Sequence, residues 1–226
     1  MFIGHFAPAL AAKAITKDAP RLGTLFIAAQ LVDWAFFLLA MVGIEKMRVV
    51  PGITEMNPMD FYHMPITHSL VGTGGFAIGF AALVYLLSRN AIAAIWAGIV
   101  VLSHWLLDLL VHRPDLTIAG GETKLGFGLW NKPWIEMPLE LGLMGLAFWW
   151  YMRRTKGPIV PPLVLLFTLL ALQAINWFGP EPQAADFAFL ATGLFAFALL
   201  TALAYWVSLT RWHKGEVGLA VATPPR

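Results

Sequence analysis

Long apolar stretches alternate with short polar breaks along the chain. Crossing the ~30 Å hydrocarbon core of a bilayer takes about 20 residues of helix, and each of these stretches has roughly that length. They lie at about 23–44, 68–88, 90–112, 134–152, 159–178 and 185–208. The pattern predicts an all-α polytopic membrane protein of about six transmembrane helices.

The first residues form a shorter apolar segment. Residues 2–16 are too few to span a bilayer and are interrupted by Pro8. We therefore expect a short N-terminal helix that is interfacial or re-entrant. The segment lacks the basic start of a signal peptide, so we expect it to stay in the protein.

The spans belong to a single membrane domain, residues 1–226. Its first part, 1–140, holds spans one to four and the titratable residues considered below. Its second part, 141–226, holds the end of span four and two generic spans. Two long connections, about 45–66 and 113–133, interrupt the first part and contain several Pro and Gly.

Composition indicates that lipid is the solvent for much of this chain. Of its 226 residues 59% are hydrophobic and 12% are charged, whereas a soluble domain carries about 25% charged residues. Cysteine is absent, which excludes disulfides and thiolate metal sites. The net charge of +2 is small and its basic residues are scattered, so nucleic acid is not an expected partner. The expected partner is the lipid bilayer; the oligomeric state stays open.

Basic residues set the expected orientation, because Lys and Arg favour the cytoplasmic side of short loops. Those in the short segments that share one side of a six-span protein are Lys13, Lys17, Arg21, Arg89, Arg153, Arg154, Lys156, Arg211 and Lys214. The basic residues of the other side are diluted over the long connections and mixed with acids. The distribution predicts that both termini face the cytoplasm.

The segment SHWLLDLLVHRPD carries the clearest candidate chemistry. His104, Asp108 and His112 are spaced four residues apart, so a helix places them on one stripe. Two imidazoles and a carboxylate can ligate a borderline divalent cation such as zinc. The alternative is a polar stripe that only holds helices together. Because ionisable groups inside a bilayer are costly, the three together favour a functional site.

Other titratable residues fall in overlapping layers of the membrane. Asp33 lies near the middle of span one, His68 begins span two, and Glu136 and Glu140 begin span four. Asp33 could form a structural bond, and His68 could cap a helix. Glu136 could serve only to complement a helix N-terminus, where negative charge is stabilised. Glu140, one turn deeper, is a candidate general base.

Three further histidines are weaker candidates. His5 reaches the site only if the N-terminal helix dips inward toward Asp33. His63 lies in a loop among Pro and Met, and we expect it at the rim or surface. His213, between Trp212 and a lysine, is expected at the interface.

The order of these motifs resembles one bacterial family. GHFAPALAAK at the start, an Asp in the first span, PITHSL before span two and SHWLLDLLVHRPD ending span three resemble the inner-membrane YdjM-like proteins, which are described as membrane-bound, metal-dependent hydrolases. The resemblance covers about residues 1–140. It implies that His5, His68, His104 and Asp108 occupy the family's motif positions, with Asp33 a looser match. The sequence departs from the pattern before PITHSL, where FYHMP stands in place of a more basic segment.

Residues and resemblance together lead to a hydrolase hypothesis. We expect a membrane-embedded hydrolase that uses zinc or a similar divalent ion, with His104, Asp108 and His68 as first-choice ligands. Asp33, His112 and His5 would be further ligands or would support them. Asp33 or Glu140 would accept a proton or orient an imidazole. With both termini in the cytoplasm, span three runs outward and places His104, Asp108 and His112 in the outer half of the bilayer. That location suggests a lipid or lipid-linked substrate.

Two other classes of function remain open. A transporter or ion pathway would use the same cluster but needs polar groups across the whole membrane. Spans five and six offer few such groups, chiefly Gln173 and Asn176. A structural scaffold would use the polar groups only to hold helices together, and it predicts no bound metal.

Overall fold

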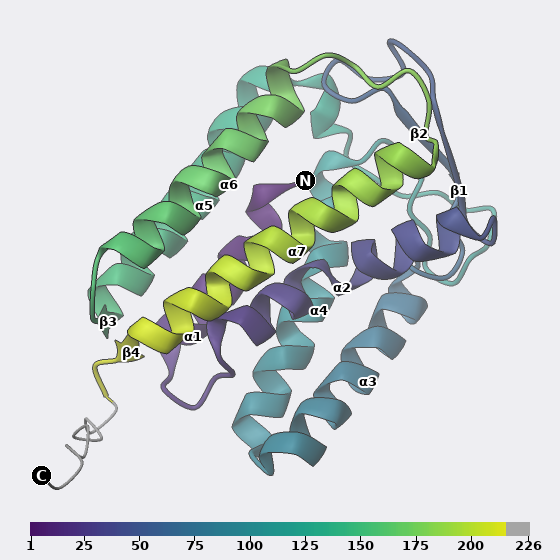
Figure 1. Cartoon of the computed structure of the whole chain (residues 1–226). Coiled ribbons are helices and arrows are strands. Elements are labelled where there is room, and N and C mark those ends of the chain that lie inside the picture. Colours follow the sequence, from purple (N-terminus) through teal and green to yellow (C-terminus); the bar gives the residue numbers. More distant parts are fainter. Residues whose placement is uncertain (216–226) are drawn as a thin grey trace, which may run out of the picture.

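The apolar stretches form α-helices at the predicted places (Figure 1). The structure, a computed structural model, describes residues 1–215. The helices that match the six predicted spans are α2 (Leu22–Met41), α3 (Leu70–Ser88), α4 (Ala91–Val111), α5 (Pro133–Arg154), α6 (Val160–Phe178) and α7 (Phe187–Thr210). Across the described residues, only short two-stranded sheets accompany the helices. The predicted all-α membrane fold is confirmed.

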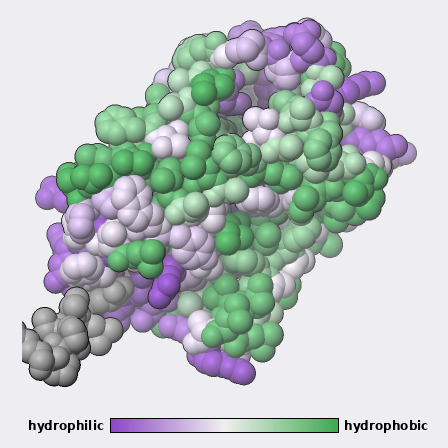
Figure 2. All heavy atoms as spheres, in the orientation of Figure 1, coloured by the Kyte–Doolittle hydropathy of each residue, from purple (hydrophilic) through white to green (hydrophobic). Residues whose placement is uncertain are grey.

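Five of these helices, α2, α3, α4, α6 and α7, are long and apolar enough to cross a membrane. They expose large apolar side chains to the outside, among them Ile78, Leu87, Phe167 and Phe195. Figure 2 shows hydrophobic surface along the helices and hydrophilic surface gathered toward the ends of the bundle. Soluble monomers rarely expose apolar surface on this scale. The fold is therefore that of a multi-pass membrane protein.

The predicted fourth span differs from the other five. Helix α5 has 22 residues but falls outside the apolar group. Its first half carries Glu136 and Glu140, both buried, and it ends at Arg153 and Arg154. Helix α5 thus brings acidic side chains into the interior of the bundle, beside α1.

The N-terminal segment enters the bundle. Ile3–Phe6 form the 3₁₀ helix η1 and Ala7–Ile15 form α1. Pro8 stands in the first turn of α1, where its missing N–H costs no hydrogen bond, so it starts the helix and does not interrupt it. The Phe6 ring stacks on Phe26 of α2 with 4.5 Å between centroids. Because the segment contacts α2, α4 and α5, it packs inside the bundle; whether it is interfacial or re-entrant stays a prediction.

The position of the chain ends bears on the predicted orientation. Met1 is 8% exposed and lies inside the bundle. The C-terminal residue, Arg226, lies outside the described residues. The sidedness of both termini stays a prediction.

Two small sheets lie at opposite ends of the bundle (Figure 1). At one end, β1 (Lys46–Val49) pairs with β2 (Met59–His63) in an antiparallel hairpin that the sequence did not predict. At the other end, β3 (Thr155–Lys156) pairs with β4 (Trp212–His213). Helices α2 and α4 finish at the hairpin end, and α3 and α5 begin there. The C-terminal halves of α2 and α4 and the segment before α3 therefore carry residues of the candidate site.

Candidate metal centre

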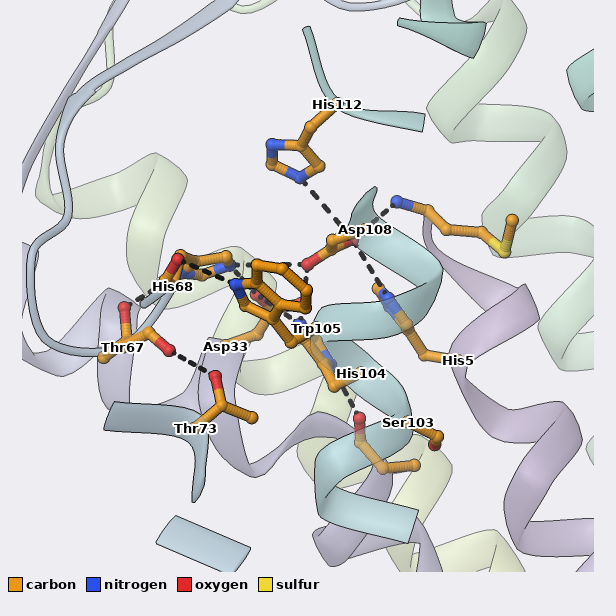
Figure 3. Close-up of polar contacts among 12 residues, drawn as sticks. His5, Asp33, Thr67, His68, Thr73, Ser103, His104, Trp105, Asp108 and His112 are labelled. Atoms are coloured by element: carbon orange, nitrogen blue, oxygen red, sulfur yellow. Dashed lines mark hydrogen bonds and ion pairs between the residues drawn. The ribbon is translucent and has the colours of Figure 1, made fainter. Parts of the chain in front are cut away.

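Four histidines and two aspartates from separate elements converge at this end of the bundle (Figure 3). His104 and Asp108 lie one turn apart on α4, and His112 follows its last residue. Asp33 comes from α2, His5 from η1, and His68 from the segment before α3. Ser69 fixes the start of α3 by accepting a hydrogen bond from the Gly72 N–H at 3.0 Å, which holds the neighbouring His68 in place.

The first ligand set lies between α2 and α4. The Asp33 Oδ1 atom is 3.3 Å from His68 Nε2 and 3.4 Å from His104 Nε2. The Asp108 Oδ2 atom faces the same two nitrogens, at 3.6 Å and 3.1 Å. Asp33, His68 and His104 form one group whose ligand atoms lie within 4.8 Å of one another and could hold a metal ion, and Asp108 Oδ2 faces the same two nitrogens.

The second set gathers around the other oxygen of Asp108. The Oδ1 atom is 3.0 Å from His5 Nε2 and 3.5 Å from His112 Nε2. The α-amino group of Met1 lies 3.2 Å from the same oxygen. The rings of His5 and His104 are stacked, with 3.8 Å between centroids, so the two sets are in direct contact.

The outer ring nitrogens of three histidines are held by acceptors. His104 Nδ1 lies 2.8 Å from the carbonyl oxygen of Ala29, and His112 Nδ1 lies 2.9 Å from Asp115 Oδ1. A carbonyl or carboxylate oxygen only accepts, so both Nδ1 atoms donate. In the neutral imidazole this places the lone pair on Nε2, which faces the aspartates. Metal-ligating histidines commonly show this arrangement.

His68 is oriented through a hydroxyl relay. Its Nδ1 lies 2.8 Å from Thr67 Oγ1, and that hydroxyl donates to Glu45 Oε2 at 2.5 Å. Having donated its proton to Glu45, the Thr67 hydroxyl accepts from His68 Nδ1–H. The Nε2 atom of His68 then carries the lone pair as well. Glu45 is completely buried and also accepts from the Ile66 and Thr67 N–H groups.

The donor set fits a bound divalent cation. His5 Nε2 and His104 Nε2 are buried without a geometrically sound hydrogen bond among the described residues, although carboxylate oxygens lie within 3.4 Å. Lone pairs that face carboxylate oxygens need a cation between them or a proton on the ring. Ligands held 2.0–2.2 Å from a tetrahedral ion lie roughly 3.3–3.6 Å apart, close to the spacing of the first set. Oxygen and imidazole donors without thiolate suit zinc or a similar divalent ion.

Asp33 is more exposed to solvent than the other members of the cluster. His5, His104 and Asp108 are each 1% exposed, whereas the side chain of Asp33 is 20% exposed. Unpaired charges at such burial would be costly, so the members depend on one another or on a bound ion. Asp33 is the member that an incoming molecule reaches most easily.

Glu140 contacts the N-terminal segment. Its Oε1 atom accepts from the Phe2 N–H at 2.6 Å and the Gly4 N–H at 2.9 Å. Its Oε2 atom accepts from Gln173 Nε2 at 2.9 Å. The carboxylate thus anchors η1, which carries His5 to Asp108. The general-base role of Glu140 stays a prediction.

Replacing Glu140 by Gln is expected to destabilise the protein by about 1–3 kcal/mol, because one acceptor oxygen is lost among three donors. Thermal unfolding in detergent, followed by tryptophan fluorescence, measures the effect. Glu181→Gln makes the same substitution in an exposed loop and is the matched control. Equal melting temperatures for the two variants would contradict the anchoring role.

Two histidines lie away from the cluster. His63 is exposed in β2, opposite Lys46, as expected for a surface position. His213 was expected at the interface but is 6% exposed. Its Nε2 lies 3.2 Å from the Ala14 carbonyl oxygen, and its Nδ1 accepts from the Gly215 N–H at 3.0 Å. The β3–β4 pairing draws it inward, so it is a structural residue at the opposite end of the bundle.

The residues that hold the imidazoles were not predicted from the sequence. Glu45, Thr67 and Asp115 were not singled out, and the Ala29 contact uses a backbone oxygen that no side-chain pattern reveals. Two signals were available. Thr67 directly precedes His68, and Asp115 follows His112 by three residues.

No protein-family model, curated protein or solved structure matches this chain. The fold and the site themselves define its class: a multi-pass membrane protein with buried His and Asp groups that could bind a metal ion.

Proposed function

We propose that this chain is a membrane-embedded, metal-dependent hydrolase that acts on a lipid or lipid-linked ester or phosphoester. The observation that carries the proposal is the arrangement of His68, His104 and His112. Each donates its Nδ1 proton outward and turns Nε2 toward Asp33 or Asp108. A scaffold has no need for imidazoles fixed in this way, whereas a metal centre does.

The ion would be held by His68, His104 and Asp108 with a position left open for water, and Asp33, His5 and His112 would lie beside it. Zinc is the ion that suits these donors best. When bound, such an ion lowers the pKa of water to about 7 and supplies hydroxide at neutral pH. Asp33, the most accessible carboxylate, is the residue placed to accept a proton from the reacting group. Burial of the other members excludes bulk water from the site.

An apolar groove supports a lipid-like substrate. It has a volume of about 420 Å³, and its lining includes Gly4, Ala7, Leu107, Leu143 and Trp150. Gly4 and Leu107 adjoin His5 and Asp108 in the sequence, although no residue of the cluster lines the groove. An acyl chain fits such an apolar surface.

The resemblance to the YdjM-like family also supports a metal-dependent hydrolase, and it suggests where in the cell the protein lies. We place the protein in a bacterial inner membrane with the site in the outer half of the bilayer. This orientation agrees with the basic residues in the short connections at the opposite end. The transporter alternative differs from this proposal because it predicts no hydrolysis, and the scaffold alternative differs because it predicts no bound metal.

The test combines metal content with a substrate screen. The detergent-purified protein is analysed by plasma mass spectrometry and then screened against lipid esters and phosphoesters, beside a His104→Ala/Asp108→Ala double variant. We expect near-stoichiometric metal and hydrolysis in the wild type and loss of both in the variant. Metal without hydrolysis of any lipid class would favour the transporter. A protein that stays metal-free after reconstitution would refute the metal-dependent proposal.

A further inference from the structure

Asp108 divides the cluster into two halves. Its Oδ2 atom faces His68 and His104, whereas its Oδ1 atom faces His5 and His112. A carboxylate whose two oxygens face different pairs of imidazoles is placed as a bridge between two ions. We propose that the centre is dinuclear, with Asp108 as the bridging ligand; this inference rests on the proposed metal-dependent function.

The first ion would have its own set of ligands. His68, His104 and the Oδ2 atom of Asp108 would supply three donors and leave the fourth position of a tetrahedral zinc ion to water, with Asp33 beside it. Because each of the two imidazoles has its Nδ1 engaged elsewhere, neither can serve a second ion. The remaining donors are the Oδ1 atom of Asp108 and the Nε2 atoms of His5 and His112.

Of these remaining donors, His112 is oriented in the same manner as the first set, whereas neither ring nitrogen of His5 has a hydrogen-bond partner among the described residues. His112 is 3% exposed and donates Nδ1–H to Asp115, which leaves its Nε2 lone pair turned toward Asp108. His5 is 1% exposed, and its Nε2 lacks a geometrically sound hydrogen bond within the described part of the chain. If a single ion occupied the first set, the Nε2 atoms of His5 and His112 would remain buried, with only the Oδ1 atom of Asp108 to share between them. A second ion gives each of them a partner.

The fold brings His5 to this place by a dedicated contact. Glu140 on α5 and Gln173 on α6 hold the backbone of η1, through the Phe2, Ile3 and Gly4 N–H groups. This clamp adds to the Met1–Asp108 ion pair and the Phe6–Phe26 stacking in holding the N-terminal segment against Asp108. Figure 3 shows His5 and His112 approaching Asp108 from different elements, beside the first set.

The test is the number of manganese ions bound per chain. The purified full-length protein is stripped with a chelator, dialysed against Mn²⁺, and assayed by plasma mass spectrometry and electron paramagnetic resonance. We expect two ions per chain and the narrowed hyperfine spacing of an exchange-coupled pair, because ions in two-metal sites lie about 3.5–4 Å apart. The His5→Ala/His112→Ala variant should retain one uncoupled ion. His63→Ala, an exposed histidine outside the cluster, should retain two.

The outcomes separate the two proposals. One uncoupled ion in the wild type would overturn the dinuclear inference and leave the mononuclear hydrolase standing. An absence of bound ions would overturn both. The wild-type count and spectrum decide the question even if the double variant fails to fold.

Discussion

Replacing Asp108 by Asn is expected to lower metal affinity by more than about 100-fold, beyond the effect usual for an outer partner. Asp108 is the acid that contacts imidazoles from all three sources: η1, the segment before α3, and α4 itself. An amide keeps the size of the side chain but removes the negative charge and one of the two ligand oxygens. Competition with a chromogenic chelator measures the affinity.

The same substitution should destabilise the metal-free protein. In the absence of an ion, imidazoles around Asp108 need protons to pair with its carboxylate, and breaking a buried ion pair costs about 3–5 kcal/mol. The matched control is Glu181→Gln, which makes the same change of charge in an exposed loop and should alter neither quantity. If Asp108→Asn bound metal as the wild type does, the centre would not be organised around this carboxylate.

The spans were predictable because membrane insertion depends on a local property. A run of apolar residues has to cover the hydrocarbon core by itself, so its length and its two ends can be predicted from the sequence. The starts and ends of α4, α6 and α7 fall within two residues of the expected positions. The placement of His104, Asp108 and His112 on one face of a helix was equally predictable, because it depends only on helical periodicity.

The position of His5 could not be settled from the sequence. It depends on Glu140 and Gln173, more than 130 residues away along the chain, which bind the backbone of η1. The Thr67–Glu45 relay is hidden for the same reason: a polar residue in a long connection gives no sign that it will be buried. The β1–β2 hairpin was missed because short strands carry little periodic signal. Convergence of several elements was predictable in outline, but the partners that orient the ligands were not.

Replacing Thr67 by Val is expected to weaken metal binding by about 10–100-fold, the usual effect of losing a partner behind a ligating histidine. The two side chains have nearly the same shape, so the fold should be kept. What is lost is the hydroxyl that accepts from His68 Nδ1 and donates to Glu45. The imidazole can then rotate or carry its proton on Nε2, where it no longer acts as a ligand.

Thr67→Ser retains the hydroxyl and is the matched control for this prediction. The affinity of both variants for Zn²⁺ is measured by chelator competition, and their melting temperatures are compared in the presence of a chelator. We expect the Ser variant to bind close to the wild type and the Val variant to fall short in affinity. Equal affinities would show that the hydroxyl does not orient His68, and the relay would then serve only to bury Glu45. A loss of affinity that follows the melting temperature would point to altered packing, whereas a loss at unchanged stability would identify Thr67 as a positioning residue of the metal centre.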